Sequence, residues 1–241
     1  MCYLLYMGLF ACTLTGVDEK TDLGRLLDLS ARFPFVEWGI LISSSPGAAR
    51  YPSPEWVASW QAPSGPGAAG VHYAFHLCGR TVYDFLAGDE AIRRFAYSAD
   101  RIQLNFNHRR KPVDLIALTN EVQPASAPAI IIQEHAGNAG LNACRLGCRH
   151  QVVFDASGGR GKLADEWPKP LSGFIQGYAG GLAPENISQE LPKIASVAGD
   201  VPFWVDMESG VRDGNDVFDL DRCESVLAQV GEFLRAGSPV S

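Results

Sequence analysis

Two adjacent glycines, Gly180 and Gly181, lie in the stretch FIQGYAGGLAPENI. A glycine has no Cβ, so it can adopt a positive φ angle and its amide can come close to a ligand. Pro184 follows at a place where a helix could begin, because its missing N–H costs little in the first helical turn. Free amides at a helix N-terminus bind anions, most often phosphate. The stretch therefore predicts either a phosphate-binding turn or an ordinary tight turn between a strand and a helix.

Three carboxylates, Asp155, Asp206 and Glu208, stand within or directly after apolar runs and could perform acid–base chemistry. Asp206 and Glu208 are two residues apart, so in a strand they would point to the same face. Two inward carboxylates are costly unless they are paired or lie in a solvated pocket. We expect Asp206 to lie deeper, bonded to Gln103 or Asn105, and Glu208 to lie nearer the mouth, where it could act as a base. Asp155 could act as an acid or could cap the loop that follows it.

Eight apolar runs of strand length would have to position these residues. They cover residues 10–16, 36–43, 71–78, 101–107, 129–135, 150–157, 173–181 and 202–209. Helical patterns lie between or after them, over residues 21–33, 53–61, 81–98, 111–122, 183–199 and 219–236. A further short helix is expected over residues 141–148, and a segment at 165–171 is broken by Pro168 and Pro170.

Strands that alternate with helical crossovers indicate parallel strands with helices outside. Eight such units in 241 residues favour a phosphate-binding (β/α)8 TIM barrel that forms one domain over residues 1–241. A doubly wound open sheet is the rival, but no G-x-G-x-x-G motif follows the first predicted strand. A barrel often holds phosphate between the loops after strands seven and eight. Gly180–Gly181 and Ser209–Gly210–Val211 stand at those two strand ends, which favours the phosphate interpretation.

The composition and net charge of the chain limit the kinds of molecule that it is expected to bind. A net charge of −7 argues against a nucleic-acid-binding protein. The six cysteines are scattered, which favours reduced thiols in the cytoplasm. Cys144, Cys148 and His150 could suggest a metal, but a second ligand pair is not evident, so neither a metal nor an organic cofactor is expected. The apolar N-terminal stretch lacks a basic start and is too short to span a bilayer, so no membrane partner is expected.

GYAGGLAPENI followed by VDMESGV resembles the last two strand–loop units of the phosphoribosylanthranilate isomerase family, TIM-barrel enzymes of tryptophan biosynthesis. Four further stretches are similar to that family in the same order: TGVDEKTD, GILISSSPGAARYPSPEWV, QLNFN and VFDASGGRGK. The resemblance implies an Amadori rearrangement, in which an aminoribose ring opens and a proton leaves C2. That chemistry needs a general acid at the ring oxygen and a general base at C2.

The resemblance also implies roles for particular residues. Asp155 corresponds to the general acid, Arg50 to the residue that holds the substrate carboxylate, and Gln103 to a substrate-binding strand position. The phosphate site corresponds to Gly180, Gly181, Leu182, Ser209 and Gly210. The family's catalytic cysteine is replaced by Thr15, and a threonine hydroxyl is a very poor base at neutral pH.

Other groups could replace the missing base. Glu208 stands where the family has a serine, and Asp18 could act as a base or as the N-cap of the first helix. Cys12 should face the opposite side of the strand from Thr15. His76 and His135 fall near strand ends and could shuttle protons or belong to the pocket wall.

Three functions remain open from the sequence. The first is an isomerase of the resembled type. The second is a lyase or aldolase on another sugar phosphate, with Glu208 and Asp155 as an acid–base pair. A Schiff-base aldolase needs a lysine inside the barrel, and no predicted strand contains one. The third is a binding protein that keeps the phosphate site without catalysis.

Overall fold

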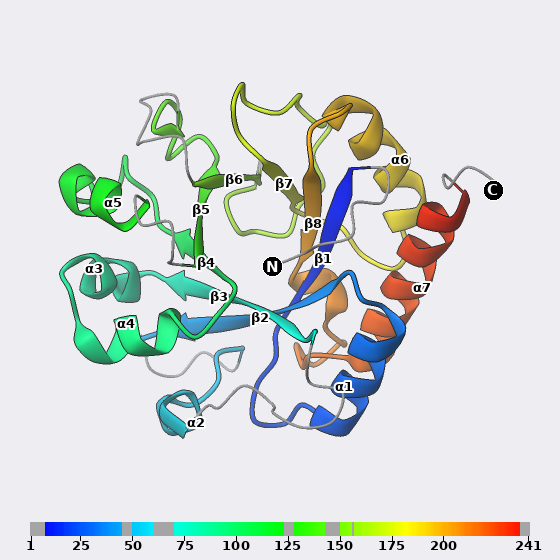
Figure 1. The fold of residues 1–241 in the computed structure, drawn as a ribbon, viewed down its shortest axis with the longest axis horizontal. Helices are drawn as coiled ribbons and strands as arrows, with labels where there is room; N and C mark the ends of the chain where they lie inside the picture. Colours follow the sequence, from blue (N-terminus) through cyan, green and yellow to red (C-terminus); the bar gives the residue numbers. More distant parts are fainter. Residues whose placement is uncertain are drawn as a thin grey trace.

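The computed structural model describes residues 8–44, 50–59, 70–122, 128–142, 150–155 and 157–236. Eight parallel strands pair in sequence order, and the last pairs with the first, so the sheet closes into a barrel (Figure 1). The strands are β1 Leu9–Thr15, β2 Val36–Ser43, β3 His72–Cys78, β4 Arg101–Asn105, β5 Ala129–Glu134, β6 Gln151–Phe154, β7 Gln176–Ala179 and β8 Phe203–Met207. The predicted (β/α)8 fold is confirmed.

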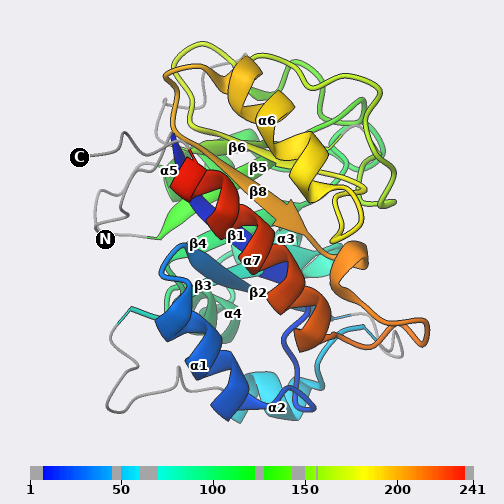
Figure 2. The same ribbon diagram turned by 90° about the vertical axis from the view of Figure 1, so that its right-hand side faces the viewer.

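Helices cover the outside of the barrel. They are α1 Leu23–Arg32, α2 Pro54–Ser59, α3 Arg80–Leu86, α4 Glu90–Ala96, α5 Leu115–Val122, α6 Ile187–Ala198 and α7 Leu220–Ala236, with a short 3-10 helix η2 at Ser209–Val211. Figure 2 shows α7 lying across β1 and β8, between α1 and α6. As expected from its two prolines, residues 165–171 form neither helix nor strand. The predicted helix at 141–148, with Cys144 and Cys148, lies mostly outside the described residues.

One predicted helix, over residues 81–98, is wrong because it is two helices. Gly88 has a φ of +92°, a left-handed conformation that cannot continue a helix. Asp89 then accepts hydrogen bonds from the backbone N–H of Ala91 and Ile92, both at 3.0 Å, and so caps α4. The break turns α4 away from α3 within a single crossover between β3 and β4.

Side chains along each strand point alternately to the outside and the inside of the barrel, so the protein has an outer core and an inner one. Outward strand side chains such as Leu14, Trp38 and Phe75 pack in the same core as helix side chains such as Leu227 of α7. Cys12 belongs to this outer core, so the expectation that it faces away from Thr15 is confirmed. Burial raises the pKa of its thiol, which therefore stays protonated.

The inside of the barrel holds a buried ion pair. Arg101 Nε donates to Glu37 Oε2 at 2.7 Å, and neither side chain is exposed to solvent. The guanidinium carbon lies 4.4 Å from the ring centroid of Trp204 and 5.2 Å from that of Phe10. The inside of the barrel thus combines a buried ion pair with a small apolar cluster formed by Phe10, Ala11, Ile131, Val153 and Trp204.

In the part of the chain that the structure describes, no helix is long and apolar enough to cross a membrane. The same residues contain no group of three or more histidine, cysteine or acidic side chains that could hold a metal ion.

Candidate active site

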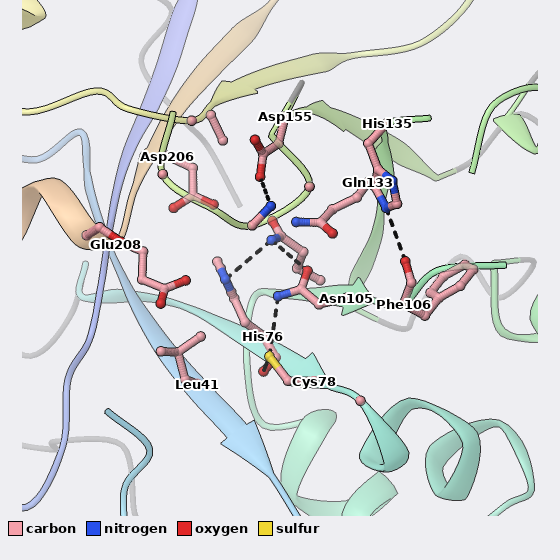
Figure 3. Close-up of a pocket in the computed structure, with 18 of the residues that line it drawn as sticks. Leu41, His76, Cys78, Asn105, Phe106, Gln133, His135, Asp155, Asp206 and Glu208 are labelled. Carbon is pink, nitrogen blue, oxygen red and sulfur yellow. Dashed lines mark hydrogen bonds between the residues drawn. The ribbon is translucent and has the colours of Figure 1, made fainter. Parts of the chain in front are cut away.

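A cavity of about 640 Å³ opens at the carboxyl ends of the strands (Figure 3). This is the end at which TIM-barrel enzymes carry their active sites. The predicted residues that line it are Arg50, Gln103, Asp155, Gly180, Gly181, Leu182, Glu208, Ser209 and Gly210. Thr15 and the alternative base candidate Asp18 are not part of the described lining.

The loops after β7 and β8 meet in direct backbone contact. A Cβ placed on Gly210 would lie 2.0 Å from the carbonyl oxygen of Leu182, so only glycine fits there. A Cβ on Gly181, whose φ is +70°, would lie 2.2 Å from the backbone nitrogen of Leu163 in the segment after β6. The glycines therefore let three chain segments pack closely, as in the tight-turn interpretation. They also place both halves of the predicted phosphate site side by side.

Asn186 fixes the loop between β7 and α6. Its side chain accepts a hydrogen bond from the backbone N–H of Ala183 at 2.9 Å and donates to the carbonyl oxygen of Gly181 at 2.8 Å. The helix begins at Ile187, later than the sequence predicted, because residues 184–186 form a turn. Within the described residues, no backbone hydrogen bond engages the N–H groups of Gly181 and Leu182, which leaves them available to an anion.

Replacement of Gly210 should damage this paired-loop geometry. We expect Gly210→Ala to weaken the binding of inorganic phosphate at least tenfold, because the new methyl group forces the Leu182 carbonyl away. Gly214→Ala is the matched control, since a Cβ there meets nothing within 4 Å. Phosphate affinity measured by calorimetry on both variants checks the expectation, and equal affinities would contradict it.

Asp155 directly follows β6 and is engaged by its own loop. Its Oδ1 accepts hydrogen bonds from the backbone N–H of Ser157 at 3.0 Å and from the Ser157 hydroxyl at 2.7 Å, and its Oδ2 accepts from the backbone N–H of Gly159. The side chain caps the loop and also lines the cavity. These bonds hold the carboxylate in a fixed orientation at the cavity wall.

The hydrogen-bond partner of Asp206 differs from the one predicted from the sequence. Its Oδ1 accepts a hydrogen bond from the Thr15 hydroxyl at 3.0 Å, so the expected bond to Gln103 or Asn105 is wrong. Burial, with a smaller contribution from the charges of Glu37 and Asp155, raises the pKa of Asp206 to about 7. Asp206 lines the cavity and can therefore take up or release a proton near neutral pH. The period-two pattern did place this side chain inside the barrel.

Thr15 lies behind Asp206. Its hydroxyl occupies the space left by Gly39 on the neighbouring strand, where a Cβ would lie 2.1 Å from Thr15 Oγ1. Thr15 is fully buried, so it orients Asp206 and does not itself reach the cavity. Asp18 is not the N-cap of α1, as the sequence suggested. It accepts from the Thr21 hydroxyl and the Lys20 amide, and Asp22 caps the helix instead.

Glu208 and Arg50 face one another at the rim. Arg50 Nη1 donates to Glu208 Oε1 at 2.6 Å, and Nη2 donates to Asp216 Oδ1 at 2.7 Å. Both side chains of the Arg50–Glu208 pair are about a third exposed. The predicted carboxylate anchor and the predicted replacement base therefore neutralise each other across the loops after β2 and β8.

His135 is a wall residue of the cavity. Its Nδ1 accepts a hydrogen bond from the backbone N–H of Gly137 at 2.9 Å, and its Nε2 donates to the carbonyl oxygen of Phe106 at 3.2 Å. Both ring nitrogens are thus satisfied within the protein, and Figure 3 shows the bond between His135 and Phe106. Arg110 and Lys111 from the loop after β4 also line the cavity.

No family model matches this chain, and no curated protein matches it in sequence. Several solved structures match it in fold, and two of them are phosphoribosylanthranilate isomerases. The phosphoribosylanthranilate isomerase from Thermus thermophilus has a TM-score of 0.63 and 19% sequence identity, over 92% of this chain and 99% of that one. Monomers generated from the dimeric phosphoribosylanthranilate isomerase of Thermotoga maritima have a TM-score of 0.55 and 18% identity, over 92% and 98% of the two chains. The chain therefore has the (β/α)8 fold of these phosphoribosylanthranilate isomerases.

Proposed function

We propose that this protein is an aldose–ketose isomerase of the phosphoribosylanthranilate isomerase type, acting on a phosphorylated aminosugar. The observation that carries the proposal is the pair Asp155 and Asp206, which line one cavity beside the paired glycine loops. An Amadori rearrangement needs two such proton-transfer groups, one for C2 and one for the ring oxygen.

Asp206 is the proposed general base. After the ring has opened to a C1=N iminium, the carboxylate of Asp206 takes the proton from C2; the electrons of the C2–H bond form the C1=C2 bond and those of the C1=N π bond return to nitrogen, which gives the enamine. A base works best when its pKa lies near the operating pH, and burial raises the pKa of Asp206 to about 7. The Thr15 hydroxyl donates to Oδ1 and holds the carboxylate in place. In this scheme Thr15 orients the general base Asp206 and does not act as a base itself.

Asp155 is the proposed general acid. It gives a proton to the ring oxygen as the bond between that oxygen and C1 breaks and the lone pair of the substrate nitrogen forms the C1=N bond. Ser157 and Gly159 fix the side chain toward the cavity. The amides of Gly181 and Leu182, with Ser209 and Gly210 opposite, are the proposed phosphate ligands. The reaction requires neither a metal nor an organic cofactor.

The lyase or aldolase alternative has less support. Glu208, its proposed base, is held by Arg50 at 2.6 Å. The described cavity lining includes one lysine, Lys111, which lies on the loop after β4 with its ammonium 3.8 Å from the ring centroid of Tyr83. A Schiff-base lysine is instead expected in a desolvated site inside the barrel.

Turnover of freshly generated phosphoribosylanthranilate, followed as the loss of anthranilate-type fluorescence, tests the proposal. We expect the wild type to be active and Asp155→Asn to lower kcat about 100-fold, the lower range for loss of an acid–base group. Asp165→Asn is the control, because that carboxylate is exposed and lies outside the cavity lining. An inactive wild type, or an Asp155→Asn variant with full activity, would refute the proposal.

A further inference from the structure

The side chains of four polar residues from β3 and β4, together with one backbone carbonyl, form a closed ring of hydrogen bonds along the cavity (Figure 3). Gln103 Nε2 lies 2.9 Å from Asn105 Oδ1 and 3.4 Å from His76 Nδ1. Asn105 Nδ2 lies 3.4 Å from Cys78 Sγ, and that sulfur lies 3.5 Å from the carbonyl oxygen of His76. The ring exists because His76 is paired with Gln103, and Cys78 with Asn105, in the register of the two strands.

The direction of each bond in this ring is fixed. An amide nitrogen only donates, so His76 Nδ1 must accept the hydrogen bond from Gln103. Burial lowers the pKa of His76 to about 4, against opposing contributions from Glu208 and Glu37 and a smaller lowering by Arg101, so the imidazole is neutral at pH 7. A neutral imidazole has one N–H, and here it must be on Nε2. Burial raises the pKa of Cys78 to about 12, so its thiol keeps the proton that it donates to the His76 carbonyl.

Two atoms of the ring residues have no partner among the described residues: His76 Nε2 and Gln103 Oε1. The two side chains are only 2% and 3% exposed, and both line the cavity. A buried polar atom without a hydrogen bond costs about 1–3 kcal/mol, so an unsatisfied pair beside a cavity indicates a ligand that satisfies it.

The chemistry of the two atoms selects the ligand group. His76 Nε2 offers a proton, and Gln103 Oε1, whose amide nitrogen is already engaged by Asn105 and His76, offers a lone pair. A hydroxyl group can accept from the first and donate to the second. A carboxylate or phosphate oxygen would face the lone pair of Gln103, and an ammonium group would face the N–H of His76.

We propose that His76 and Gln103 together bind a sugar hydroxyl group of the phosphorylated substrate, as donor and acceptor respectively. This inference rests on the proposed function, because it assigns the carbohydrate part of the phosphosugar to β3 and β4 and leaves the phosphate to the loops after β7 and β8. His76 is a binding and positioning residue in this assignment and takes no proton from the substrate.

Calorimetric titration with two probes tests the assignment. Ribose 5-phosphate carries hydroxyl groups, and n-pentyl phosphate has a chain of the same length without them. We expect the wild type to bind both, and His76→Phe and Gln103→Met each to weaken ribose 5-phosphate binding about tenfold, the loss of one good hydrogen bond. Affinity for n-pentyl phosphate should stay within about twofold of the wild type. Circular dichroism establishes that each variant is folded.

His72→Phe is the matched control for His76→Phe. His72 lies on the same strand and the same face, but at the opposite end of β3, where its Nδ1 lies 3.2 Å from Asp100 Oδ2. This variant should bind both probes as the wild type does. If His76→Phe weakens both probes equally, or neither, the hydroxyl site is wrong while the phosphate site stands. If the folded wild type binds neither probe, the phosphosugar function fails and this inference fails with it.

Discussion

Replacing Asp206 with asparagine is expected to lower kcat about 1000-fold, within the range for loss of a general base. The effect should exceed that of Asp155→Asn because removing a proton from carbon is harder than protonating an oxygen. Asparagine keeps an oxygen that can accept the bond from Thr15 Oγ1, so the geometry behind the site is preserved. Single-turnover kinetics with phosphoribosylanthranilate measures the chemical step directly.

The same substitution should make the protein more stable at alkaline pH. Folding raises the pKa of Asp206 from 3.8 to about 7, so the folded state binds more protons than the unfolded state between those pH values. The stability associated with the protonated group is fully present below pH 3.8 and is lost as the pH rises through about 7. At pH 8 the buried charge costs up to about 4 kcal/mol, which the neutral amide avoids.

Urea unfolding of the wild type and Asp206→Asn at pH 5 and pH 8 checks this prediction. We expect the free energy of unfolding of the variant to exceed that of the wild type by about 2–4 kcal/mol at pH 8, and by less at pH 5. Asp165→Asn, which removes an exposed carboxylate, should show no such pH-dependent difference. A difference that is the same at both pH values would mean that Asp206 does not titrate in this range.

Replacing Arg101 with methionine should cause the largest loss of stability. The guanidinium is fully buried and donates to Glu37, to Gln151 Oε1 at 2.9 Å and to Thr13 Oγ1 at 3.1 Å. Without it, the Glu37 carboxylate is left in the barrel without its countercharge, at a cost of about 3–5 kcal/mol. That is a large fraction of the roughly 5–15 kcal/mol by which domains are stable. Urea unfolding at pH 7 measures the change.

A double variant separates the loss of charge pairing from the loss of packing. Arg101→Met combined with Glu37→Gln should be more stable than Arg101→Met alone, because no buried charge remains uncompensated. Arg94→Met on the exposed face of α4 is the control and should change the free energy of unfolding by less than about 0.5 kcal/mol. If the double variant is the less stable one, the cost arises from lost contacts with Trp204 and Phe10.

The strands were predictable because their apolar runs are short and bounded. The second strand was predicted at residues 36–43 and is found at Val36–Ser43. The seventh is shorter than predicted, over Gln176–Ala179, because Gly173, with a φ of +88°, lies in a turn before the strand and Gly180, with a φ of +100°, leaves the ladder after it. The break at Gly88 was missed because a glycine within a helical pattern does not by itself reveal its φ angle.

The site residues that lie at strand ends were predictable from the sequence. The hydrogen bonds between residues far apart in the sequence were not. Barrel geometry alone brings Asp155, Gly181 and Gly210 to one cavity. The bond between Thr15 and Asp206 joins residues 191 positions apart, and no local pattern announces it. The pKa of Asp206 depends on that burial, so its value as a base emerges only from the closed barrel.

The ion pairs of Arg50 with Glu208 and Asp216 determine how strongly a ligand must bind in order to reach the Arg50 guanidinium. The two carboxylates are tethered to the same chain, so they compete for the guanidinium at a high effective concentration. An incoming carboxylate gains only the difference between its own contact and the one that it displaces. A weak anion from the solvent, such as acetate, is therefore expected to compete poorly for Arg50. Under the proposed function, a ligand whose phosphate is already bound would compete as an intramolecular partner, so the arginine would favour molecules that carry two anionic groups at the correct separation.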